Sequence, residues 1–121
     1  MSQENRLEKT NRINLLFDFY ELLLTEKQQM FLKYYFHDDY SLGEIAAEFD
    51  ISRQAVYEHI KRAEQVLEMY ENKLGLMDKH YRRSRHLEQL RGILEQDGLN
   101  EVQRTEALQQ LSELEQVDDM S

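Results

Sequence analysis

The sequence contains no proline and only four glycines among its 121 residues, and this shortage of helix-breaking residues constrains the fold most strongly. Proline removes a backbone donor and clashes with the preceding helical turn, and glycine is the next most unfavourable residue inside a helix. Valine, isoleucine and threonine also lack the alternation of period two that marks a half-buried strand. The sequence therefore predicts an all-α protein, helical over nearly its whole length.

Capping residues mark the predicted helix ends. Thr25 with Gln28, and Ser41 with Glu44, have the spacing at which an N-cap hydroxyl and a side chain three residues later satisfy each other's backbone amides. By residue type we further expect N-caps at Thr10 or Asn11, Ser52, Asp78 and Asn100, and left-handed C-caps at Gly75 and Gly98.

The aromatic residues divide the chain unequally. Of the 12 tyrosine and phenylalanine residues, 11 lie within residues 1–75, and only Tyr81 lies beyond. Because bulky rings fill protein cores, we predict a compact core domain of four helices over 1–75. Residues 76–121 are predicted to form a C-terminal helical extension, an appended pair of helices with a thinner apolar stripe.

The first predicted helix, over about 11–24, is apolar around most of its circumference. One stripe comprises Ile13, Leu16, Phe17, Tyr20 and Leu23, and a second comprises Leu15, Phe19 and Leu22. A surface this wide is usually covered from two sides, so the helix is either central to the domain or shared with a second copy. A homodimer through the first helix is therefore one of two open alternatives.

The fourth predicted helix carries a heptad-like seam at Val56, Ile60, Ala63, Leu67, Tyr70 and Leu74. Its length of about two and a half repeats falls short of the three or four repeats that indicate a free coiled coil. The seam favours packing against the first helix of the same chain.

Residues 41–62 have the pattern of a helix-turn-helix, which needs a short first helix, a small residue at the crossing, a tight turn and a capped second helix. Leu42, Ile45 and Phe49 supply the inner face, Ala46 is the small residue, and Asp50-Ile51 makes the turn. Ser52 caps the second helix, and Val56 and Ile60 pack this helix against the first one. The predicted core domain is thus a helix-turn-helix domain.

The outer face of the second helix is the first candidate binding surface. It presents Arg53, Gln54, Tyr57, Glu58 and Lys61, and Arg53 and Gln54 suit the edges of guanine and adenine. Within 41–62, however, three basic residues face four acidic ones, and the whole chain carries a formal charge of -9. Because an excess of Lys and Arg normally supplies the grip on phosphates, a scaffold or protein-binding role is an equal alternative.

Six segments follow one another in a specific order and spacing within 1–75: Leu7-Glu8-Lys9-Thr10-Asn11-Arg12, Leu15-Leu16-Phe17-Asp18-Phe19-Tyr20, Leu23-Leu24-Thr25-Glu26-Lys27-Gln28, Ser41-Leu42-Gly43-Glu44-Ile45-Ala46, Ser52-Arg53-Gln54-Ala55-Val56-Tyr57 and Lys61-Arg62. With these segments, the chain resembles the YlxM family of small bacterial proteins. The resemblance implies an all-helical fold related to the promoter-binding helix-turn-helix of sigma factors. Through the family's gene neighbourhood, it also implies a role in the signal recognition particle pathway.

One basic run follows the core. Residues 79–86 contain Lys79, Arg82, Arg83 and Arg85 and no acid. This run could contact RNA phosphates or an acidic partner, and equally it could balance the chain's own acidic residues.

Several function classes lack their required residues. There is no cysteine, Gly-rich phosphate loop, His-Glu-x-x-His or nucleophile elbow, so we expect no enzyme, no cofactor and no metal site. His37, Asp38 and Asp39 are expected to solvate a turn. No membrane span or secretory segment is expected, which favours a cytoplasmic protein.

The helix-turn-helix and the missing catalytic motifs favour a binding and regulatory protein, and the resemblance to the YlxM family implies that it acts on the protein or RNA of the signal recognition particle. The candidate binding residues are Arg53, Gln54, Tyr57, Lys61, Lys79, Arg82, Arg83 and Arg85. Two alternatives stay open. One is a transcription regulator that inserts Arg53, Gln54 and Tyr57 into the major groove of duplex DNA, and the other is an assembly adaptor that uses the apolar face of 13–23.

Overall fold

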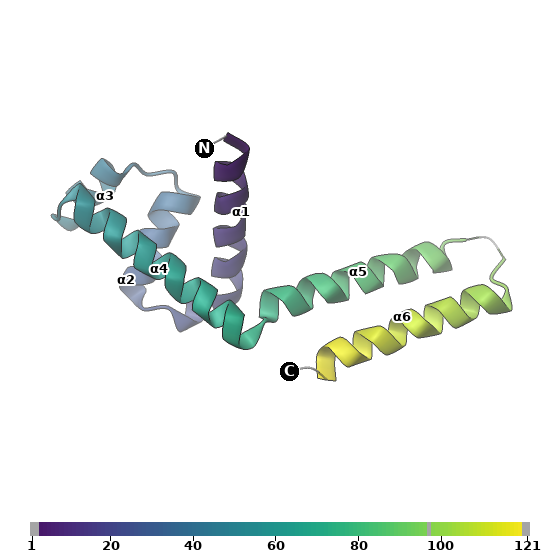
Figure 1. The fold of residues 1–121 in the computed structure, drawn as a ribbon. Helices are drawn as coiled ribbons and strands as arrows, with labels where there is room; N and C mark the ends of the chain where they lie inside the picture. The colour runs from purple at the N-terminus through teal and green to yellow at the C-terminus, as the bar shows by residue number, and fades with distance from the viewer. Residues whose placement is uncertain (1–2, 97, 120–121) are drawn as a thin grey trace. The chain divides into compact units, whose positions relative to one another are not determined.

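The computed structural model describes residues 3–96 and 98–119, and within them it contains six α-helices and no strand. The predicted all-α fold is confirmed. The helices are α1 (Gln3–Tyr20), α2 (Glu26–Leu32), α3 (Leu42–Phe49), α4 (Arg53–Leu74), α5 (Leu76–Leu94) and α6 (Glu101–Asp119), with a 3-10 turn η1 (Glu21–Leu23) and a π-helical turn η2 (Lys33–His37) (Figure 1). None of these helices is long and apolar enough to cross a membrane.

The chain divides into two compact units, Met1–Lys73 and Leu74–Ser121. Among the described residues, 14 buried apolar side chains lie in the first unit and two, Met77 and Ala107, lie in the second. The core of the protein is therefore in the first unit, where the aromatic residues are concentrated.

Most of the predicted caps are confirmed. In three reciprocal pairs, each side chain accepts a hydrogen bond from the other residue's backbone N–H at 2.9 to 3.2 Å: Thr25 with Gln28, Ser41 with Glu44, and Asn100 with Gln103. Gly75 and Gly98 adopt the left-handed conformation, with φ of 63° and 72°. The reciprocal pairs and Gly75 therefore mark helix ends correctly, because each cap acts within three or four residues. The predicted C-cap at Gly98 is wrong, because α5 ends at Leu94 and its C-cap is the right-handed Glu95.

The boundaries predicted for the first helix are wrong at both ends. The helix begins at Gln3, well before Thr10 and Asn11, because the intervening residues include strong helix formers and no breaker. It ends at Tyr20 and continues as η1, so the predicted core residue Leu23 is 50% exposed and Leu24 is buried in its place.

The predicted start of the fifth helix at Asp78 is also wrong. The left-handed Gly75 ends α4 and opens α5 at once, and the Lys79 N–H donates to the Gly75 carbonyl at 2.9 Å. A single glycine thus replaces the expected longer connection.

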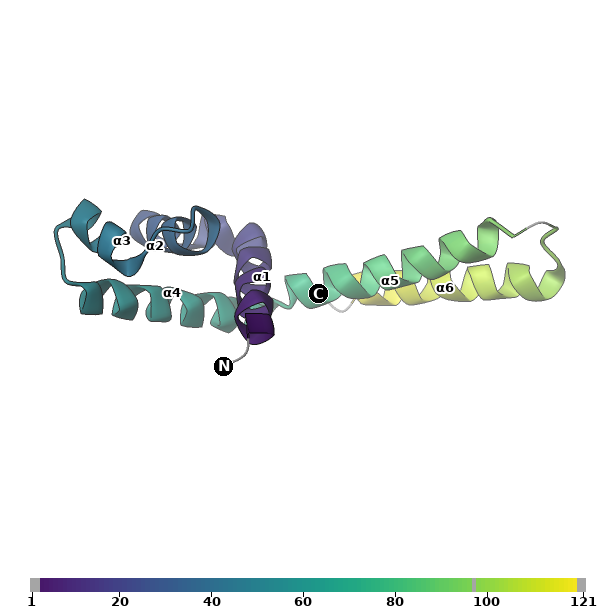
Figure 2. The ribbon, with the colours of Figure 1, turned by 90° about the horizontal axis from the view of Figure 1, so that it is seen from above.

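In the first unit, α1 packs against α4, as the heptad-like seam predicts. Tyr20 is fully buried, its ring stacks on Tyr70 at 5.9 Å, and its hydroxyl donates to Glu71 at 2.6 Å. At the edge of this contact, Arg12 and Glu68 form two parallel hydrogen bonds of 2.7 Å, which lower the pKa of Glu68. Figure 2 shows α2 and α3 together on one side of α4.

The second unit is a hairpin of α5 and α6, which lie antiparallel and side by side in both views (Figures 1 and 2). Between the two helices, His86 Nδ1 lies 2.7 Å from Gln110 Oε1 and 3.1 Å from Glu113 Oε2. These contacts define the sides of α5 and α6 that face each other.

Candidate binding surface of the helix-turn-helix

The turn between α3 and α4 has a left-handed residue at its centre. Asp50 has φ 54° and ψ 48°, and its N–H and that of Ile51 both donate to the carbonyl of Ala46. The Ser52 hydroxyl then accepts from the Ala55 N–H at 3.0 Å and caps α4. Three residues therefore reverse the chain, as the helix-turn-helix pattern predicts.

Buried side chains lock the two helices together. Ile45, Val56 and Ile60 are 0 to 3% exposed, and the small Ala46 is also buried. Phe31 of α2 joins both helices, because its ring stacks on Phe49 of α3 at 4.6 Å and on His59 of α4 at 4.8 Å. The opposite side of α4 is left at the surface.

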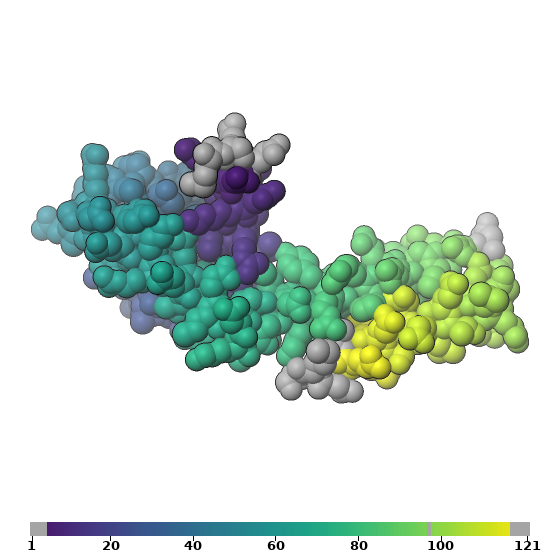
Figure 3. Space-filling view, viewed as in Figure 1, coloured from purple at the N-terminus to yellow at the C-terminus, as the bar shows by residue number. Residues whose placement is uncertain are grey.

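The predicted binding residues at the start of α4 lie on that surface. Arg53 and Gln54 are exposed, and Tyr57 is 46% exposed. Figure 3 shows atoms of α4, in teal, along the visible face of the first unit. This outer ridge, defined by Arg53, Gln54, Tyr57 and Lys61, can therefore contact another molecule.

Two residues of the outer ridge already have neighbours in the chain. The Arg53 guanidinium lies against Gly43 of α3, where an added Cβ would come within 3.0 Å of Nη2. Gln54 Nε2 donates to Glu58 Oε1 at 3.4 Å. Both side chains therefore contact neighbours within the helix-turn-helix while remaining exposed.

Lys61 lies at the inner end of the ridge, between a ring and a carboxylate. Its Nζ is 5.5 Å from the Tyr57 ring centroid and 3.5 Å from Glu64 Oε2. Glu64 is 7% exposed, and its other oxygen lies 3.1 Å from Lys9 Nζ of α1. A buried carboxylate thus holds two lysines from two helices, as buried charges require.

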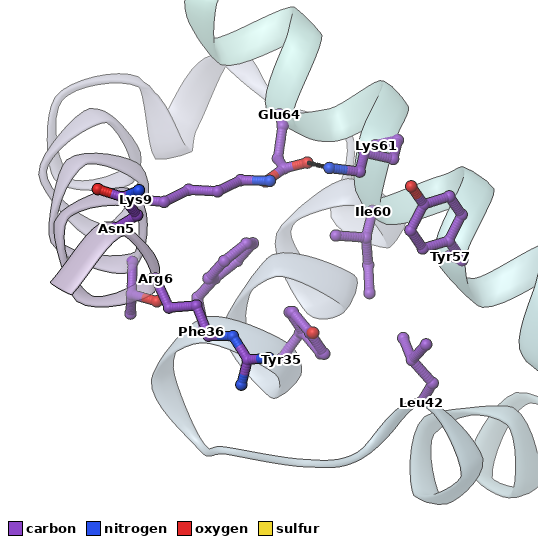
Figure 4. A pocket seen from close by; sticks show the side chains of 11 residues that line it. Asn5, Arg6, Lys9, Tyr35, Phe36, Leu42, Tyr57, Ile60, Lys61 and Glu64 are labelled. Carbon is purple, nitrogen blue, oxygen red and sulfur yellow. Dashed lines mark ion pairs between the residues drawn. The ribbon is translucent and has the colours of Figure 1, made fainter. Parts of the chain in front are cut away.

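Beside the ridge opens a pocket of about 410 Å³, drawn in Figure 4. Residues of α1, η2, α3 and α4 line it: Asn5, Arg6, Lys9, Thr10, Tyr35, Phe36, Leu42, Tyr57, Ile60, Lys61 and Glu64. Figure 4 shows Lys9 extending from α1 to Glu64 on α4. Tyr57 and Lys61 belong to both the ridge and the pocket, so the two form one continuous surface.

The pocket differs in charge from the rest of the chain. Its lining carries three formal positive charges, Arg6, Lys9 and Lys61, against the single negative charge of Glu64. Two partly exposed rings, Tyr35 and Tyr57, lie in the same lining. Cations combined with accessible rings suit a ligand that has both an anionic group and a planar group.

Arg6, Lys9 and Tyr35 line the pocket but are not among the residues predicted from the sequence. They lie on α1 and η2, outside the helix-turn-helix segment. The only local signal is the spacing of Arg6 and Lys9, which places two cations three residues apart on one helix face.

The predicted basic run lies in α5, in the other unit. Arg85 is exposed, while Lys79, Arg82 and Arg83 are partly buried. Arg82 Nη1 lies 3.9 Å from Asp78 Oδ2 within the same helix. Part of this run is therefore engaged by the chain's own acidic residues. Over the described residues, no three His, Asp or Glu side chains gather as a metal site would require.

The stacked His59 predicts a dependence of stability on pH. Burial lowers its pKa below 6.5, and the positive charges of Lys27 and Arg62 lower it further. The unfolded chain therefore binds the proton at a higher pH than the folded protein does. We expect the free energy of unfolding to be highest above about pH 7 and to fall as the pH drops through about 6.5, levelling off below the folded pKa.

Urea denaturation between pH 5 and 8 measures this effect against His59→Gln, which retains the other three histidines. As the pH falls from 8 to 5, the free energy of unfolding of the wild-type protein should decrease relative to that of the variant. Parallel curves for the two proteins would contradict the assignment.

Comparison with known proteins extends the similarity beyond the motifs. Residues 7–116 match the UPF0122 family, described as "Putative helix-turn-helix protein, YlxM / p13 like". A UPF0122 protein of Listeria innocua is 50% identical over 108 residues, which cover 89% of this chain and 98% of the relative. UPF0122 proteins of Halalkalibacterium halodurans (55% identical, covering 78% of this chain and 87% of the relative) and Bacillus mycoides (52%, covering 87% and 98%) are similar.

Proposed function

The chain belongs to the UPF0122 family of YlxM/p13-like helix-turn-helix proteins, and from this premise we propose that it is a non-enzymatic, regulatory binding protein of the signal recognition particle pathway. The resemblance stated from the residues of 1–75 is confirmed at the level of the family. Our proposed target is the RNA of the particle, bound in the cytoplasm without a cofactor. Lys79, Arg82, Arg83 and Arg85 are proposed as auxiliary phosphate contacts.

The pocket beside the outer ridge carries this proposal. A chain with a net charge of -9 cannot rely on overall attraction to phosphates, so RNA binding needs a local positive site. Arg6, Lys9 and Lys61 supply that charge, and Tyr35 and Tyr57 supply rings on which an unpaired base can stack. Sequence-specific RNA recognition uses such unstacked bases in loops and bulges.

Single-stranded RNA suits this surface better than duplex DNA does. A base in a duplex stays in its stack, whereas an unpaired base can enter a pocket of a few hundred Å³. The duplex alternative instead depends on Arg53 and Gln54, which lie against Gly43 and Glu58.

We expect Tyr57→Ala to weaken binding of the particle's RNA by roughly 10- to 100-fold, because stacking of one base contributes about 1–3 kcal/mol. Titration of the labelled RNA at about 0.15 M salt, followed by fluorescence anisotropy, measures this loss. Tyr40→Ala is the matched control, since Tyr40 is 38% exposed and lies outside both the pocket lining and the basic run of α5. Its affinity should stay within about twofold of wild type.

Two results would overturn the RNA assignment. Binding of the particle's GTPase without any binding of its RNA would make a protein the target. Equal losses in Tyr57→Ala and Tyr40→Ala would remove the pocket from the mechanism.

The second candidate is a sequence-specific regulator of transcription. The geometry of the capped α4, with Arg53 and Gln54 exposed at its first turn, favours it. In this case the protein binds duplex DNA alone, and Arg53→Ala abolishes its sequence preference, at a cost of about 1–3 kcal/mol for a bidentate base contact.

A further inference from the structure

The α5–α6 hairpin leaves most of its large apolar side chains at the surface. Among its described residues only Met77 and Ala107 are buried. Its exposed apolar side chains, 38 to 67% accessible, include Leu87, Leu94, Leu99, Val102, Leu108 and Leu111. Two helices with so little buried surface are marginally stable, because isolated helices depend on packing of an apolar face.

The leucines of the two helices fall on one side of the hairpin. His86 of α5 faces Gln110 of α6 across the helix contact. Leu87 follows His86 and Leu111 follows Gln110, so each leucine lies about 100° further round its helix than the residue at the contact. In an antiparallel pair, residues displaced from the contact by the same rotation point toward the same side of the pair. Helical spacing then extends this side into the apolar face, defined as Leu87, Leu90, Leu94, Leu108 and Leu111.

The two helices carry opposite charge. Within its bounds α5 has five basic and two acidic residues, whereas α6 has six acidic and one basic residue. When a second hairpin lies on the apolar face, the basic α5 of one copy attracts the acidic α6 of the other if these two helices are adjacent. The charges repel if α5 lies on α5 and α6 on α6.

From the apolar face and this charge pattern, we infer that the protein forms a homodimer in which two hairpins associate as a four-helix bundle. The two-fold axis runs parallel to the helices, because in this arrangement α5 of each copy lies over α6 of the other copy. A rotation about an axis across the helices would stack α5 on α5 and α6 on α6. The closed two-fold contact buries the apolar face of both copies at once.

The oligomeric state of the full chain tests this inference. Light scattering after size exclusion should give twice the 14.7 kDa of one chain. Leu87→Glu and Leu111→Glu, each placed at an exposed position, should return the mass to that of one chain while helicity by circular dichroism is retained. A wild-type monomer, or a dimer that survives both substitutions, overturns the inference.

Leu22→Glu is the matched control, because Leu22 is 93% exposed and lies in the first unit. This variant should remain dimeric. A monomeric Leu22→Glu would instead place the dimer contact at the apolar stripes of residues 11–24, which end in η1, and would overturn the hairpin dimer.

A distance between two spin labels tests the direction of the axis. The chain has no cysteine, so Glu95→Cys at the exposed end of α5 gives one label per copy. With the axis along the helices, both labels lie at the same end of the bundle, about 15–25 Å apart given interaxial distances of about 8–10 Å. With the axis across the helices, the labels would lie at opposite ends of the bundle and at least about 30 Å apart, since α5 is about 28 Å long. That distance would overturn the proposed axis.

Discussion

Replacement of Phe31 by alanine is expected to lower the free energy of unfolding by about 3–5 kcal/mol, the usual cost of deleting a buried aromatic ring. The Phe31 side chain is 1% exposed, and it is the contact through which α2 holds both helices of the helix-turn-helix. Urea denaturation followed by tyrosine fluorescence measures the change. Six of the seven tyrosines lie in the first unit, so the signal reports on that unit.

Phe31→Leu separates the loss of the ring from the loss of volume. Leucine keeps most of the buried apolar volume but not the contacts with Phe49 and His59, so we expect a loss of about 1 kcal/mol. A loss below about 1 kcal/mol in Phe31→Ala would show that α2 does not support the helix-turn-helix as described.

Tyr20→Ala is expected to cost a similar 3–5 kcal/mol, because it deletes a fully buried ring at the contact between α1 and α4. The substitution also leaves the Tyr70 ring without its stacking partner and Glu71 without the hydroxyl at 2.6 Å. The same urea denaturation experiment measures the change.

Tyr20→Phe is the control for the hydroxyl. The ring and its stacking remain, and Glu71 is only partly buried and can bind water, so we expect a loss of about 1–2 kcal/mol. Equal losses in the phenylalanine and alanine variants would assign the stability to the hydrogen bond and contradict the packing argument.

The two contacts differ in what they support for binding. Phe31 holds α3 and α4 together and so supports the outer ridge, whereas Tyr20 holds α1 against α4, and α1 and α4 both line the pocket. Loss of either contact removes part of the surface on which the proposed recognition of RNA depends.

Sequence patterns predicted the helix-turn-helix and most helix ends because each signal is local. Ser41 with Glu44 caps α3, Ser52 caps α4, and Asp50 provides the turn, all within a few residues. The errors arose where residue type was used without such a reciprocal partner. Thr10 and Asn11 resemble N-caps, but nothing nearby breaks the helix, and α1 continues through them.

The binding surface was only half predictable. Exposure of Arg53, Gln54 and Tyr57 follows from helical periodicity once Val56 and Ile60 face inward. The pairing of Lys61 and Lys9 through the buried Glu64 does not follow, because these residues are up to 55 positions apart and periodicity does not determine which helix faces which.

By itself, the sequence determined that this chain is all helical, that residues 41–62 form a helix-turn-helix, and to which family it belongs. These properties depend on the spacing of caps, turns and apolar residues along the chain. Only the tertiary structure decided that Arg6, Lys9, Tyr35 and Tyr57 line one cationic pocket and that His86 of α5 lies against Gln110 of α6. The physical reason is that a pocket or an apolar face joins side chains from separate helices, and their packing in space brings them together.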